Sequence, residues 1–264
     1  MLYWKIMFNS VQSNTAYRFH SFVSTFNRIL NVIVNVSLWT ALYAGVNLVS
    51  SEVNISLEDM ITYAILSTFV TILIQNGNIG SISSKVQSGE IAIYMIRPIG
   101  LFRALLFEEV GRKIFVVIFE ALPVLIFGSF IFGVHFPDTI HLLLFVLTLL
   151  HAFLIYFMIT FILGLLSFWY IRVFHLEFML NHVMNFFSGV FIPLWFFPDI
   201  LVTVSSVLPF ELIYFGPMTI FLEQASMSEI GTMLIKTYIW IGLIAALCMF
   251  IHRKAIRMLV VQGG

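Results

Sequence analysis

Long apolar segments separated by short polar connections run along almost the whole chain. A helix needs about 20 apolar residues to cross the hydrocarbon core of a bilayer. Five segments easily meet this requirement, and a sixth meets it with some polar content. We therefore predict an all-α, polytopic membrane protein with six transmembrane helices at residues 29–49, 60–80, 114–134, 142–170, 178–197 and 232–251.

Two of the remaining segments look unlike spans because charged side chains interrupt them. Residues 1–28 mix aromatic side chains with Lys5, Arg18 and Arg28, a pattern typical of an amphipathic helix that lies in the membrane interface. Residues 81–113 form the only sizeable polar connection on the basic side of the six-span arrangement. We expect the first to be an interfacial helix and the second to be a cytoplasmic region.

The segment before the last predicted span, residues 198–231, is apolar but interrupted by Pro198, Pro209 and Pro217. Because proline breaks helices, this segment is predicted to form a re-entrant pair of short helices at the external face. Irregular backbone at membrane depth is tolerated only against protein or a wet cavity.

Composition supports a membrane protein and excludes a soluble domain. Hydrophobic residues make up 61% of the chain and charged residues 10%, whereas soluble domains carry about a quarter charged residues. The chain has 13 Lys and Arg residues, and all of them except Lys236 fall on the same side of the six-span arrangement as the two termini. Because basic residues gather on the cytoplasmic side, we expect both termini to be cytoplasmic and the protein to lie in the cytoplasmic (inner) membrane.

The connection at 81–113 contains a short apolar helix that follows Gly89-Glu90 and ends at Arg97-Pro98. Pro98 disfavours helical structure at Arg97, so the chain must turn there. Such a helix either lies on lipid headgroups or docks onto a cytoplasmic partner, since both uses need an amphipathic surface.

The arrangement resembles the permease subunits of type-2 ATP-binding-cassette exporters over nearly the whole chain. The resemblance rests on the interfacial helix, the six spans, Gly89-Glu90 followed by Tyr94-Met95-Ile96-Arg97-Pro98-Ile99, and the proline-rich stretch before the last span. It implies that residues 81–113 hold a coupling helix for a separate ATPase. The coupling residues that it implies are Gly89, Glu90, Tyr94, Arg97, Pro98 and Arg103.

The same resemblance implies that residues 1–264 form a single transmembrane permease domain without enzyme activity. Gly77-Asn78-Ile79-Gly80 lacks the lysine and the spacing of a P-loop, so ATP and Mg would be bound by the partner ATPase and no cofactor by this chain. The expected partners are ATP-binding-cassette subunits, a second identical or related permease chain and the lipid bilayer, with no nucleic acid. The cargo is not legible from the sequence.

Several polar residues fall within the predicted spans, where they are functional candidates. They are Glu120, His151, Asn181, His182 and Asn185. They either line a polar cavity or make hydrogen bonds between helices, and the second interpretation is the simpler one. Glu120 needs a partner or a neutral form at that depth. A metal site is not expected, because the spacing of His135 and His141 across Pro137 places them on no common helix face.

Two other classes of function compete with a permease. Glu108-Glu109 near Arg112 resembles an intramembrane protease motif, but the arginine is one residue too close and later histidines lack the expected spacing. An ion pair between Glu108 and Arg112 at i,i+4 is a simpler expectation. A secondary transporter would usually show internal repeats and spans broken near the midplane, which this chain lacks.

Overall fold

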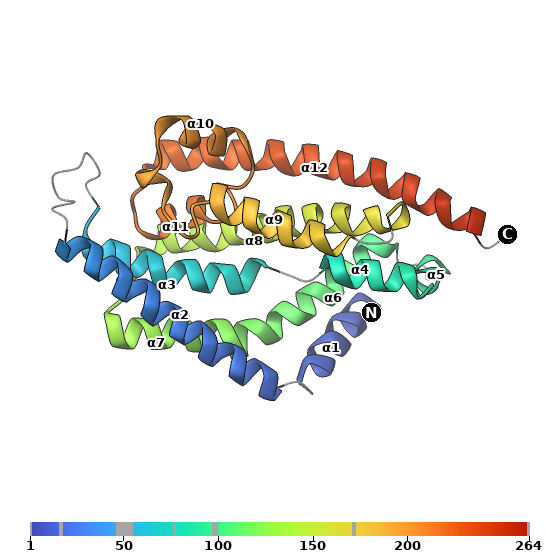
Figure 1. Ribbon diagram of the computed structural model, residues 1–264, viewed down its shortest axis with the longest axis horizontal. Coiled ribbons are helices and arrows are strands. Elements are labelled where there is room, and N and C mark those ends of the chain that lie inside the picture. Colours follow the sequence, from blue (N-terminus) through green and yellow to red (C-terminus); the bar gives the residue numbers. More distant parts are fainter. Residues whose placement is uncertain are drawn as a thin grey trace.

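The computed structural model describes residues 2–15, 18–45, 55–75, 78–96, 100–170 and 173–262, and this part of the chain is helical with no strands. Its helices run in the order α1 (Leu2–Thr15), α2 (Arg18–Gly45), α3 (Leu57–Ile74), α4 (Asn78–Gln87), α5 (Ile91–Ile96), α6 (Leu101–Val116), α7 (Leu122–Phe132), α8 (Thr139–Leu165), α9 (Phe174–Phe187), α10 (Asp199–Val207), α11 (Phe215–Phe221) and α12 (Met227–Gln262). Figure 1 places α5, the start of α1 and the end of α12 at one end of the bundle, and α10 and α11 near the other. These are called the α5 end and the α11 end.

Four helical stretches in the described residues are long and apolar enough to cross a bilayer. They are Leu57–Gln87, Leu101–Phe132, Thr139–Phe168 and Met227–Met258. The prediction of a multi-pass helical membrane protein is therefore confirmed. The count of six stays a prediction: α2 is long but polar, and α9 has only 14 residues, about 21 Å of helix.

Two helices begin before the spans that were predicted for them. α2 begins at Arg18, before the predicted span at 29–49, and no glycine or proline interrupts it up to Gly45. α1 is the separate N-terminal helix. α6 begins at Leu101 and continues into α7. Residues 101–113, the last part of the predicted cytoplasmic region, are therefore helical and continuous with the third predicted span.

A π-helical turn at Val117–Ala121 joins α6 to α7. Pro123 follows this turn and has no N–H to offer to the carbonyl of Phe119, four residues earlier. The Thr25 hydroxyl of α2 donates a hydrogen bond to that carbonyl at 3.0 Å. The sequence thus explains the irregular turn, and such turns are frequent at functional sites.

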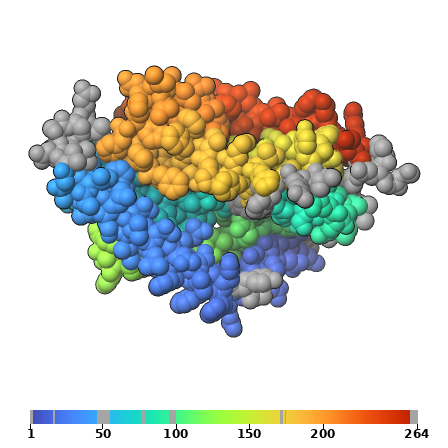
Figure 2. Space-filling view, in the orientation of Figure 1, coloured from blue at the N-terminus to red at the C-terminus, as the bar shows by residue number. Residues whose placement is uncertain are grey.

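α8 packs against α4, α11 and α12. Its contact with α4 is close, because a Cβ added at Gly164 would lie 2.7 Å from Ile82 Cδ1. By contrast, only 17% of the most apolar stretch of α12 is buried, compared with 61% of the most apolar stretch in Leu57–Gln87. Figure 2 shows α2 along the outside of the bundle, where Phe22 and Val34 are exposed.

The segment predicted to be re-entrant forms two short helices, α10 and α11. Pro198 precedes the first residue of α10 and Pro217 lies in the first turn of α11, positions that need no helical N–H. All of α11 after Phe215 is buried. That these helices dip into a bilayer stays a prediction.

Candidate functional site

The short helix α5 attaches to the bundle by one face. Gly89 has φ +75°, a conformation open to glycine, and lets the chain turn between α4 and α5. Ile91 and Tyr94 are buried, whereas Ile93 is 46% exposed. Glu90 lies exposed in the turn before α5. The outer face of α5 is therefore open to a partner.

One hydrogen bond joins the buried face of α5 to α6. The Tyr94 hydroxyl donates to Oε1 of Glu108 at 2.9 Å, and Lys85 Nζ lies 5.7 Å from the centre of the Tyr94 ring. Two other predicted coupling residues, Arg97 and Pro98, lie outside the described residues. Because α6 continues into α7, the contact connects α5 with a helix that is long enough to cross the membrane.

α1 is held on α6 beside this contact. Ser10 Oγ donates to the Glu108 carbonyl at 2.6 Å. A Cβ at Gly111 would collide with the Met7 carbonyl, so only glycine allows this approach. Arg103, also a predicted coupling residue, is exposed and its Nη1 lies 3.4 Å from the Tyr3 hydroxyl. α1, α5 and α6 thus form one connected unit.

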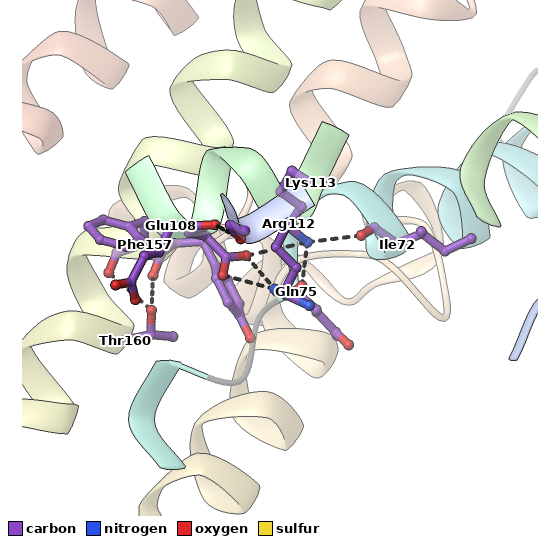
Figure 3. A network of polar contacts seen from close by, with 10 residues as sticks. Ile72, Gln75, Glu108, Arg112, Lys113, Phe157 and Thr160 are labelled. Carbon is purple, nitrogen blue, oxygen red and sulfur yellow. Dashed lines mark hydrogen bonds and ion pairs between the residues drawn. The ribbon is translucent and has the colours of Figure 1, made fainter. Parts of the chain in front are cut away.

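The next turn of α6 binds the end of α3 (Figure 3). Lys113 is buried, and its Nζ donates to the carbonyls of Ile72 at 3.0 Å and Gln75 at 2.5 Å. A cation is favoured there because the C-terminal end of a helix carries partial negative charge. Lys113 Nζ also lies 4.0 Å from Glu109 Oε1, so this contact combines a cap with an ion pair.

The two adjacent glutamates of α6 face different partners. Arg112 donates to both carboxylate oxygens of Glu109, at 3.0 and 2.5 Å. The predicted ion pair between Glu108 and Arg112 is therefore wrong: Glu108 accepts from Tyr94 instead. Because the carboxylates do not converge, the arrangement does not favour a protease that uses Glu108 and Glu109 together.

A polar pocket of about 240 Å³ opens between α2, α3 and the segment that contains α9. All its lining residues except Val190 and Phe191 are polar: Arg28, Asn31, Asn35, Ser67, Thr68, Thr71, Gln75 and Asn185. Gln75 Nε2 donates to Asn185 Oδ1 at 3.2 Å across it. Such a concentration of amides and hydroxyls within a membrane bundle marks a functional candidate.

Glu120 finds its partner beside this pocket. The distance from Arg28 Nε to Glu120 Oε2 is 3.5 Å, and Ser24 Oγ donates to the same oxygen at 3.3 Å. Glu120 is buried and lies in the π-helical turn. The sequence assigned Arg28 to the interfacial helix and so did not indicate its pairing with Glu120. The longer α2 places Arg28 ten residues after the first residue of that helix.

The other predicted intramembrane residues do not meet at this pocket. Asn181 accepts from the Tyr156 hydroxyl at 2.7 Å. His182 is exposed, with Nδ1 2.7 Å from the Phe178 carbonyl of its own helix. His151 packs against the ring of Tyr238 on α12. Of the five candidates, Asn185 lines the pocket, and Glu120 pairs with the lining residue Arg28.

Near the α11 end, Asp138 caps α8. It accepts from the backbone N–H of His141 at 2.7 Å and lies 2.7 Å from Nδ1 of the same residue, while its own N–H donates to Glu223. The backbone bond from His141 and then the imidazole contact lower the pKa of Asp138 below its ordinary value of 3.8. Oxygen and nitrogen atoms of Asp138, His141 and Glu223 lie within 4.8 Å of one another. Helix capping accounts for this cluster, and the absence of a metal site stays a prediction.

One ion pair lies beside the prolines of the predicted external segment. Pro209 lies in the turn between α10 and α11. Glu211, two residues later, pairs with Lys236 of α12. Pro198 precedes α10 and Pro217 lies in the first turn of α11, as described above. The pair holds the α10–α11 connection against α12.

A family model described as ABC-2 family transporter protein matches residues 29–263. The chain belongs to this ABC-2 transporter family. The predicted resemblance to type-2 permease subunits is thereby confirmed, and this ABC-2 permease is a membrane component of an ABC transporter. Its family implies association with an ATP-binding-cassette component. No curated protein matches the chain.

Proposed function

We propose that this ABC-2 permease is one membrane half of an ATP-driven exporter, with both termini and α5 in the cytoplasm and the spans in the inner membrane. The observation that carries the proposal is the way α5 packs on the bundle. Ile91 and Tyr94 bury one face of the helix, and Ile93 is exposed on the other. A docking helix needs both features, because it must receive a partner and pass on its movement. The ATPase subunits would bind ATP and Mg, and this chain no cofactor.

The contacts on α6 supply a path for that movement. When the ATPases close, they would push α5, and the Tyr94–Glu108 bond would carry the displacement to α6. α1 would follow α6 because Gly111 brings their backbones together. Lys113 would carry it to α3. ATP can shift such an equilibrium only through contacts that differ between two arrangements of the helices.

The polar pocket is our candidate for contact with cargo. It lies between α2, α3 and the α9 segment, and Lys113 binds the end of α3 that also bears Gln75. Movement of α6 would therefore change the pocket. A second permease chain, identical or related, would pack against the outside of the bundle and complete the path for the cargo.

The test is ATP-driven transport in vesicles that contain the permease and its ATPase. We expect Arg97→Glu to insert normally and to lose transport, since the charge of a coupling contact is reversed. A variant that co-purified with its ATPase and transported normally would show that the coupling assignment is wrong.

A further inference from the structure

A second cavity, of about 520 Å³, lies between α6, α8 and α12, away from the polar pocket. Its lining residues are mostly apolar. They include Phe102, Arg103, Met158, Phe161, Ala245 and His252. Phe102 stands edge-on to Phe161 at 5.2 Å between ring centres, so α6 and α8 together make an apolar floor. Cavities of this size hold small-molecule ligands.

This second cavity, called the groove from here on, has one apolar and one basic end. Ala245 and His252 are seven residues apart on α12, about 10 Å along the helix axis. Arg253, Lys254 and Arg257 follow His252 and are exposed. Among the described residues that line the groove, Arg103 carries the formal charge and none is acidic. The basic end therefore lies where the apolar stretch of α12 gives way to basic residues.

Two polar groups at this end have little to bind within the described chain. Arg103 is exposed, and its Nη1 donates a long hydrogen bond of 3.4 Å to the Tyr3 hydroxyl. Nε2 of His252 is buried without a hydrogen-bond partner among the described residues. A buried polar atom without a partner is costly, so an outside group that supplied one would be stabilised.

We propose that the groove binds an anionic phospholipid from the leaflet at the α5 end, with its phosphate beside Arg103 and one acyl chain along the apolar floor. The charge of the groove matches an anionic headgroup, and its apolar length matches part of a chain that enters the hydrocarbon. The site goes beyond the proposed transport function. Because Arg103 also contacts Tyr3 of α1, a bound lipid would contact the connected unit of α1, α5 and α6.

Native mass spectrometry of the full-length chain, stripped of lipid in detergent, tests the proposal. The probes are phosphatidylglycerol and phosphatidylcholine with identical acyl chains. We expect phosphatidylglycerol to bind more tightly. Arg103→Gln should weaken phosphatidylglycerol about fivefold and leave phosphatidylcholine unchanged, since one basic residue contributes about 1 kcal/mol to binding of an anionic lipid.

Lys254→Gln is the matched control, because Lys254 Nζ lies 4.6 Å from the centre of the Phe250 ring and does not line the groove. Met249→Trp, at an exposed lining position, should weaken both lipids by filling the apolar part. Equal binding of the two lipids, equal losses in Arg103→Gln and Lys254→Gln, or unchanged binding in Met249→Trp would overturn the proposal. So would displacement of the lipid by inorganic phosphate at equal concentration, which would show a plain anion site. None of these results depends on transport.

Discussion

Tyr94→Phe removes one hydroxyl from the contact between α5 and α6. The ring is 6% exposed and would stay in place, with Lys85 still beside it. A hydrogen bond to a charged group contributes about 1.5–3 kcal/mol. Because Glu108 is only partly buried and water can replace the hydroxyl, we expect a loss near the lower end, about 1.5 kcal/mol.

The consequence for transport follows from that magnitude. If the bond must persist while the ATPase moves α5, its loss weakens coupling by about tenfold, since 1.4 kcal/mol corresponds to a factor of ten. The assay measures cargo moved per ATP hydrolysed in vesicles that contain the permease and its ATPase. Tyr170→Phe, at an exposed tyrosine, is the control. Unchanged transport per ATP in Tyr94→Phe would refute the path from α5 to α6.

Three further variants test the packing of the bundle. Gly111→Ala should destabilise the protein by about 1–3 kcal/mol because its Cβ meets the Met7 carbonyl, whereas Gly242→Ala, with open space around it, should not; thermal unfolding in detergent compares the two. Lys113→Met removes two hydrogen bonds to α3 and should cost about 2 kcal/mol in the same assay; a variant as stable as wild type would contradict the cap. Asp138→Ala should lower the melting temperature near neutral pH. Because capping lowers the pKa of Asp138, its stabilisation is present above the ordinary value of 3.8 and lost as the pH falls through the lower folded value, so wild type and variant should converge in acid. A constant difference down to acid pH would contradict this.

The helical class, the long apolar helices and the short helix at Ile91–Ile96 could be predicted because each follows from hydrophobic segment length or from local glycine and proline. Helix ends were harder. The start of α2 was placed too late because Arg18 and Arg28 read as interfacial, although no residue in that stretch breaks a helix. Composition indicates where a helix prefers to lie in a membrane, but only packing decides how far it continues.

The site was predictable only in part, for a geometric reason. Glu120 was recognised as needing a partner, but Arg28 lies on another helix and no sequence spacing reveals that pairing. The polar pocket likewise takes residues from α2, α3 and the α9 segment. Arg112 pairs with Glu109 rather than Glu108, because Glu108 accepts a hydrogen bond from Tyr94 on a separate helix. One clue was present in the sequence: Pro123 marks the irregular turn that holds Glu120.

Photocrosslinking from the outer face of α5 tests the central claim most directly. Ile93→Cys, labelled with a thiol-reactive benzophenone in the assembled transporter, places the probe at a position that is 46% exposed. Ile200→Cys on α10, 78% exposed near the opposite end, is the control. The account predicts a crosslink to the ATPase subunit from Ile93→Cys and none from Ile200→Cys. A crosslink to the ATPase from Ile200→Cys alone would contradict both the coupling role of α5 and the proposed orientation.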